Sequence, residues 1–111
     1  MSASSFVDAH MLVWRDTPCA GVQWKKLHFD AASGESAVLL KFAPGASYDA
    51  HRHPEGEQYL VLEGELDDGG KRYGAMTYVR HAPGSSHRPS APSGALVFVV
   101  LKKPIESLNV S

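Results

Sequence analysis

Short apolar stretches alternate with clusters of Gly, Pro, Ser and Asp along the chain, and no window shows a sustained helical period. Val, Leu, Phe and Tyr are enriched in the apolar stretches, which is typical of strands bounded by turns. The pattern predicts strands over residues 11–14, 22–29, 36–42, 58–62, 75–80 and 95–102. Strands this short and this evenly spaced, with no helices between them, predict an all-β antiparallel sandwich or barrel.

The length and composition restrict the chain to an ordinary small protein. Its 111 residues are enough for one domain, residues 1–111, and too few for two. The net charge is −1 with no basic block, which argues against a nucleic-acid partner. The longest apolar run, residues 95–101, is too short to span a membrane. The N-terminus lacks a signal-peptide pattern, and Cys19 is the single cysteine, so we expect a cytoplasmic protein.

The residues that carry chemistry lie mainly between Gly45 and Gly64. His51 and His53 are two apart, so in an extended strand both imidazoles point to one face. The breakers that follow allow a turn that can swing Glu57 back towards the same centre. A second imidazole source, His87, comes just after a Pro-Gly turn. Three neutral imidazoles and one carboxylate suit a single divalent ion of Fe, Zn, Ni, Cu or Mn.

The same stretch carries a family resemblance. Gly45, His51-x-His53, Glu57 and Gly64 have the spacing of the first cupin motif, and Pro83-Gly84 with His87 fits the core of the second. Over roughly residues 35–103 the chain resembles the cupin domain of ChrR-type anti-sigma factors. It is also similar to small stand-alone cupins such as acetylacetone-cleaving dioxygenases.

This resemblance implies a cupin double-stranded β-helix, the RmlC-like jelly-roll barrel, with frequent dimers. It implies that the metal ligands are His51, His53, Glu57 and His87. It also implies that the strand after Pro83-Gly84 lies beside the strand of the first motif, which is how His87 would join the other ligands. ChrR-type proteins hold their sigma factor with a separate N-terminal domain, which we do not expect in this protein.

Several other residues have alternative interpretations. Glu55 is the rival carboxylate, although its place between Pro54 and Gly56 favours solvent exposure. His81 and His28 could contact a ligand carboxylate or a substrate, but each is better explained as a surface or strand residue. Tyr59 has the same parity as Glu57 and either lines the barrel interior near the metal or belongs to the core. The Asp-Asp-Gly-Gly sequence of residues 67–70 predicts a hairpin, to which we assign a purely structural role.

Two functions fit these features best. The first is a metal-dependent dioxygenase that binds a small chelating oxygen substrate, such as a β-dicarbonyl, in the barrel. The second is a non-catalytic metal or small-molecule sensor, for which a closed zinc site is the better match. A sugar- or polyketide-modifying isomerase is a third. We also expect a homodimer, because a small barrel has edge strands that need partners, with residues 11–14 and 95–101 as candidates for pairing.

Overall fold

The computed structural model describes residues 3–108 and is almost entirely β-structure, as the sequence predicts. Its strands are β1 (Arg15–Asp16), β2 (Val22–Phe29), β3 (Ser36–Phe42), β4 (Ala46–Ser47), β5 (His51–His53), β6 (Glu57–Asp68), β7 (Lys71–Gly74), β8 (Tyr78–His81), β9 (Ser85–His87), β10 (Ser90–Ala91), β11 (Ala95–Leu101) and β12 (Glu106–Ser107). One 3-10 turn, η1, covers Ala9–Met11. Within the described residues, no helix has the length and apolar character needed to cross a membrane.

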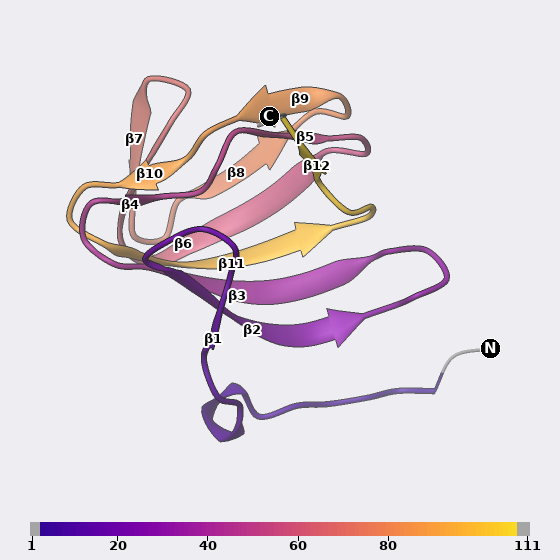
Figure 1. Cartoon of the computed structure of the whole chain (residues 1–111). Coiled ribbons are helices and arrows are strands. Elements are labelled where there is room, and N and C mark those ends of the chain that lie inside the picture. The colour runs from indigo at the N-terminus through magenta and orange to yellow at the C-terminus, as the bar shows by residue number, and fades with distance from the viewer. Residues whose placement is uncertain (1–2, 109–111) are drawn as a thin grey trace.

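The strands form one large curled antiparallel sheet and one small sheet (Figure 1). The large sheet has the order β1-β2-β3-β11-β6-β10-β4, with β7 and β8 also paired to β6. The small sheet has the order β12-β5-β9. Figure 1 shows β2 and β3 on one side of the molecule and β5 and β9 on the other. Strands β5 and β9 pair with each other although more than thirty residues separate them in the sequence, and this pairing places His51 opposite His87.

Alternation along the long strands separates an inner from an outer face. In β11, Ala95, Val97 and Val99 are buried and the residues between them are half-buried. Inward residues of the neighbouring strands, such as Val38 and Val61, pack against these in one core. Because side chains alternate with a period of two, the core faces of β3, β11 and β6 line the inside of the curled sheet.

Strand β6 changes its inward parity halfway along. Glu57, Tyr59 and Val61 are buried, and after an exposed stretch the buried positions are Leu66 and Asp68. The register against β11 shifts here, since Leu96 faces Glu63 whereas the next residue faces Val61. One extra residue on β6 marks a β-bulge, which reverses which side chains point inward.

The predicted strands compare closely with the observed ones in the centre of the sheet and less well at the N-terminus. Strands β2 and β3 have the predicted bounds, and β11 ends one residue early. Strand β6 runs on to Asp68 instead of ending at residue 62, and β8 begins only at Tyr78. The hairpin at residues 67–70 joins β6 to β7 as predicted.

Residues 11–14 do not form the predicted strand. Asp8 accepts a hydrogen bond of 3.0 Å from the His10 N–H and caps η1, and only Arg15–Asp16 then pair with β2. Met11 and Val13 are 81% and 73% exposed, so these two apolar side chains lie outside the core. Strand β11 is also no free edge, because β3 and β6 flank it on both sides. Pairing through β11 across a two-fold axis is therefore wrong, whereas contact of residues 11–14 with a second copy stays a prediction.

Gly64 provides a test of the bend in β6. Its φ is +76°, and a Cβ there would collide with the Gly94 carbonyl oxygen. Gly64→Ala is expected to lower the free energy of unfolding by about 3 kcal/mol, since left-handed strain and overlap with rigid backbone add. Gly69→Ala is the matched control, because Gly69 also has positive φ (+60°) but open space around it, and should cost only about 1 kcal/mol. Urea unfolding measures both, and equal losses would contradict the steric role of Gly64.

Candidate metal centre

Two imidazoles project from β5 into the interior. His51 and His53 are 4% and 0% exposed, whereas Arg52 between them points outward and forms an ion pair of 2.7 Å with Glu106. The two rings meet edge to face with their centroids 4.7 Å apart. The strand alternation that the sequence predicts therefore places both imidazoles on one buried face.

A tight turn between β5 and β6 brings a carboxylate to these rings. Gly56 has φ +81°, and a Cβ there would lie 2.5 Å from the His81 carbonyl oxygen, so the turn depends on glycine. Glu57 follows and is 8% exposed, with its Oε2 3.1 Å from His53 Nε2. Glu55 is exposed at the turn, so the structure brings Glu57 to the imidazoles and leaves Glu55 outside.

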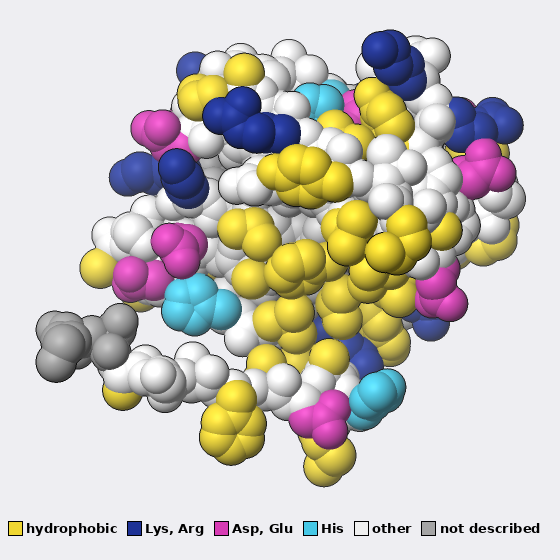
Figure 2. Space-filling model, turned by 180° about the vertical axis from the view of Figure 1, so that it is seen from behind, with side chains coloured by type: hydrophobic (Ala, Val, Ile, Leu, Met, Phe, Trp, Pro, Cys, Tyr) yellow, Lys and Arg dark blue, Asp and Glu magenta, His cyan; other side chains and the backbone are white. Residues whose placement is uncertain are grey.

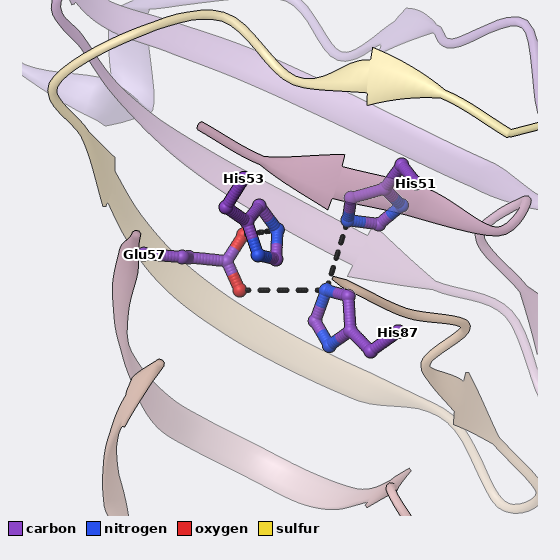
Figure 3. Close-up of side chains that lie close together, drawn as sticks. All are labelled: His51, His53, Glu57 and His87. Atoms are coloured by element: carbon purple, nitrogen blue, oxygen red, sulfur yellow. Dashed lines mark hydrogen bonds and ion pairs between the residues drawn. The ribbon is translucent and has the colours of Figure 1, made fainter. Parts of the chain in front are cut away.

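The third imidazole comes from β9. Antiparallel pairing sets His87 directly opposite His51, and their Nε2 atoms are 2.8 Å apart. His87 Nε2 is also 3.6 Å from Glu57 Oε1. Figure 3 shows the side chains pointing at one another from β5, β6 and β9. One ligand atom from each of these residues lies within 4.8 Å of the others: His51, His53, Glu57 and His87.

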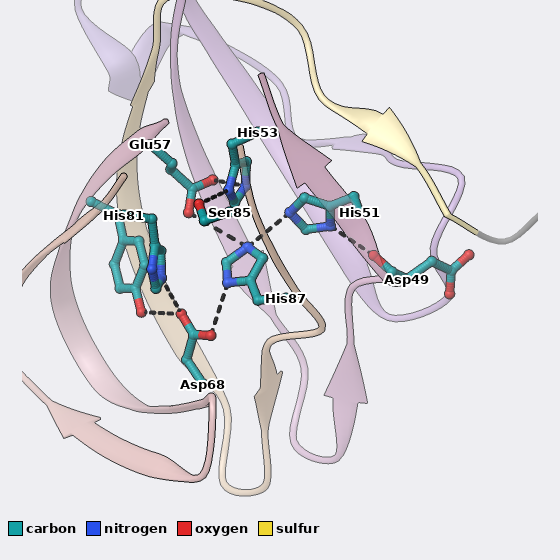
Figure 4. Close-up of polar contacts among 9 residues, drawn as sticks. Asp49, His51, His53, Glu57, Asp68, His81, Ser85 and His87 are labelled. Atoms are coloured by element: carbon teal, nitrogen blue, oxygen red, sulfur yellow. Dashed lines mark hydrogen bonds and ion pairs between the residues drawn. The ribbon is translucent and has the colours of Figure 1, made fainter. Parts of the chain in front are cut away.

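The contacts of each Nδ1, the ring nitrogen that points away from the centre, determine which nitrogen of each imidazole carries the proton. His51 Nδ1 is 2.7 Å from the Asp49 carbonyl oxygen, and His87 Nδ1 is 2.8 Å from Asp68 Oδ1. A carbonyl and an ionised carboxylate only accept, so both Nδ1 atoms must donate. In the neutral rings each Nε2 then presents a lone pair to the centre. His53 Nδ1 has a longer contact of 3.5 Å with Ser85 Oγ (Figure 4).

The Nε2 atoms, which point to the centre, therefore lack good hydrogen-bond donors within the protein. Two Nε2 lone pairs facing each other at 2.8 Å repel unless a cation lies against both. His53 Nε2 is buried without a hydrogen-bond partner, and such atoms are rare in folded proteins. Nitrogen ligands about 2.1 Å from an ion and at right angles to each other are about 3 Å apart. This His/Glu group therefore fits a divalent transition metal and could bind one.

Burial keeps the His51 ring in its metal-binding form. Desolvation lowers the pKa of His51 below its usual value, and positive charge on His87 or His53 would lower it further. The hydrogen bond to the Asp49 carbonyl opposes this shift but does not reverse it. Since metal binds only the neutral imidazole, His51 remains a competent donor into mildly acidic conditions.

Asp68 is the site residue that the sequence analysis missed. It lies in the predicted hairpin, yet it is 3% exposed and points inward because of the bulge in β6. Besides the His87 contact, it accepts hydrogen bonds of 2.6 Å from the Tyr59 hydroxyl and 2.8 Å from His81 Nε2 (Figure 4). Burial alone would raise the pKa of Asp68, but hydrogen bonds from His87, Tyr59 and His81 outweigh it and lower the pKa. Asp68 is thus an ionised buried carboxylate.

The remaining histidines divide into one inside and two outside. The His81 side chain is 24% exposed and its ring stacks on His53 at a centroid distance of 6.0 Å. His28 and His10 are 51% and 98% exposed and lie outside the centre. Cys19 is buried, and burial raises the pKa of its thiol, so it is not an activated nucleophile.

An apolar cavity of about 280 Å³ leads to the centre. His51, Glu57 and His87 lie in its wall, and most of the rest is aliphatic or aromatic, including Trp24, Phe42, Leu66, Val97 and Ile105. The wall also includes Tyr48, whose ring meets His51 edge-on at 5.2 Å. Burial, helped by the charges of Cys19, Asp49 and Glu57, raises the pKa of Tyr48 to about 12, so its hydroxyl keeps its proton at neutral pH. The cavity therefore combines apolar walls with a protonated tyrosine next to the candidate ligands.

Solved structures with the same architecture include several cupins. An acetylacetone dioxygenase from Acinetobacter johnsonii superimposes with a TM-score of 0.91 at 17% identity, covering 98% of this chain and 80% of that chain. An RmlC-like cupin from Ralstonia eutropha JMP134 gives 0.86 at 17% identity, covering 96% and 73%. Rhodobacter sphaeroides SigE in complex with the anti-sigma ChrR gives 0.71 at 25% identity, covering 85% and 50%. The expected RmlC-like cupin fold is therefore confirmed.

Sequence comparison gives the family. No curated protein sequence matches the chain. The family model of the ChrR cupin-like domain matches residues 2–105, which is nearly the whole chain. The protein therefore belongs to the ChrR cupin-like domain family.

Proposed function

We propose that the protein binds one divalent transition metal, Fe, Zn, Ni or Mn, through His51, His53, Glu57 and His87. The observation that carries this proposal is the pair of Nε2 lone pairs of His51 and His87, which face each other at 2.8 Å beside a buried His53 Nε2 that makes no hydrogen bond. A cation shared by these donors relieves the repulsion and satisfies the orphaned nitrogen at once. The carboxylate of Glu57 supplies a compensating negative charge.

We further propose that the site acts as a dioxygenase on a small chelating oxygen substrate such as a β-dicarbonyl. The bound metal would polarise the chelating oxygens and, as Fe(II), support reaction with dioxygen. The protein residues orient the substrate: the apolar walls enclose its alkyl flanks and exclude water, and the Tyr48 hydroxyl can donate to one of its oxygens. The fold that this chain shares with an acetylacetone dioxygenase supports this reading.

The alternative is a non-catalytic metal or small-molecule sensor. The ChrR cupin-like family and the likeness to the ChrR complex with SigE favour it. The same residues would then hold a closed zinc site, and a ligand in the cavity would be sensed without being converted. The identity of the bound metal and its reaction with dioxygen separate the two functions.

Metal content of single alanine variants tests the centre. Each of His51→Ala, His53→Ala, Glu57→Ala and His87→Ala removes a donor and should lower bound metal at least tenfold under limiting metal. Glu55→Ala and His10→Ala are the controls and should bind as wild type. Occupancy of the wild type should also fall below about pH 6, because protonated imidazoles cannot bind the ion and the His51 pKa lies below its usual value. A folded His87→Ala protein that keeps full metal and wild-type affinity would show that the centre is wrongly assembled.

Oxygen uptake tests the reaction. The Fe(II)-loaded protein should consume dioxygen when acetylacetone is added, whereas the Zn-loaded protein and Fe(II)-treated His87→Ala should not. An oxygen electrode measures the rate, with buffer containing the same Fe(II) as the background. Purified protein that contains zinc, together with no uptake for any β-dicarbonyl after iron loading, would favour the sensor over the dioxygenase.

We also propose that the protein forms a homodimer through the outer face of the large sheet. Phe98 lies between Leu39 and Leu60 on neighbouring strands, and these outward side chains are only half-buried. Figure 2 shows apolar side chains gathered on one face of the molecule beside the N-terminal segment, where Phe6 is 99% and Met11 81% exposed. Apolar surface of this kind is stabilised by a partner.

Light scattering at micromolar concentration should give twice the chain mass. Phe98→Lys should shift the protein towards the monomer, because it places a charge at the centre of the apolar row. Circular dichroism checks that the variant is folded. A wild type that is only monomeric at this concentration would contradict the dimer.

A further inference from the structure

Asp68 connects three elements of the barrel at one buried point. Its Oδ1 accepts from His87 Nδ1 on β9, and its Oδ2 accepts from the Tyr59 hydroxyl on β6 and from His81 Nε2 on β8. The side chain of Asp68 is fully buried and that of His87 is 6% exposed. Because both oxygens accept hydrogen bonds, the plane of the carboxylate is fixed. The direction from which Oδ1 accepts the hydrogen bond of His87 is fixed with it.

We propose that Asp68 is the positioning residue of the centre. By accepting the Nδ1 proton of His87, it fixes the tautomer and orientation of that ring, so that Nε2 turns its lone pair towards His51 and Glu57. Metal-bound histidines commonly donate their outer N–H to such a carboxylate, which also makes the ring a better donor. The consequence for metal affinity rests on the proposed metal centre, whereas the hold on the His87 ring does not.

His87 needs such support more than the other imidazoles do. It ends β9, a strand of three residues whose only partner in the described chain is β5. His51, which lies opposite His87 in β5, is instead paired on both sides, with His87 of β9 and with Ser107 of β12. The ring of His87 is therefore held at its outer edge chiefly by Asp68.

A competing explanation is a second ion at this point. Ligand atoms of Asp68, His81 and His87 also lie within 4.8 Å of one another. The contacts of 2.6–2.8 Å around Asp68 are, however, those of hydrogen bonds to an ionised carboxylate with three donors. We therefore assign positioning to Asp68, and the number of ions bound per chain tests the alternative.

The first experiment uses the metal-free protein. Long-range ¹H–¹⁵N NMR of the histidine side chains should show His87 as the Nδ1–H tautomer in the wild type. Asp68→Ala should shift it towards Nε2–H, and Asp68→Asn, which keeps the shape but has one acceptor oxygen for three donors, should give a mixture. Asp67→Ala, a neighbouring residue whose carboxylate pairs with exposed Arg72, is the matched control and should leave the tautomer unchanged. A wild-type His87 in the Nε2–H form would overturn the proposal whatever the variants do.

The second experiment measures Zn²⁺ affinity by competition with a chromogenic chelator. Asp68→Ala should weaken binding by about 10- to 100-fold, Asp67→Ala should not change it, and Asp68→Ala should have no further effect once His87 is alanine. An equal loss in both backgrounds, an unchanged affinity, or two ions in the wild type with one in Asp68→Ala would each overturn positioning through His87. A wild type that binds no ion would instead reject the proposed centre, and the tautomer of His87 would still decide the role of Asp68.

Discussion

The pairing of β5 with β9 is the constraint on which the site depends. It sets His51 opposite His87 and brings their Nε2 atoms to within 2.8 Å of each other. Two neutral imidazoles do not favour this arrangement, because their facing lone pairs repel. The outer contacts of both rings, to the Asp49 carbonyl and the Asp68 carboxylate, prevent either ring from turning its N–H inward. The fold thus holds a set of incompletely satisfied nitrogen donors in its interior, and a bound cation would make that arrangement favourable.

Most of the fold and of the donor set could be predicted because their determinants are local. The alternation that points His51 and His53 to one face needs only three residues of strand. The turn that returns Glu57 needs a glycine at position 56, which the sequence provides. Strands β2 and β3 have clear turns at both ends and were predicted to the residue. The place of His87 is non-local, and only the family resemblance implied it.

The features that the sequence did not disclose depend on long-range register. If side chains alternated regularly from Glu57 along β6, Asp67 would point inward and Asp68 outward. The bulge opposite Leu96 reverses this, and no residue type in the sequence indicates the bulge. Residues 11–14 are apolar, which favours a strand, yet Met11 and Val13 stay exposed and the segment pairs with no strand of the described structure. In both cases the outcome depends on what neighbouring elements offer, which composition and periodicity do not contain.

The apolar lining of the cavity links the candidate metal centre to the function proposed for it. Apolar walls raise the cost of leaving imidazole and carboxylate groups without partners, so they strengthen the requirement for a cation. The same walls would favour small chelating molecules with alkyl flanks, which is the substrate class proposed for the site. In that proposal Tyr48, which burial keeps protonated, would donate a hydrogen bond to an oxygen that purely apolar ligands lack. The proposed metal binding and the proposed ligand choice would therefore have one physical origin, the apolar lining of the cavity.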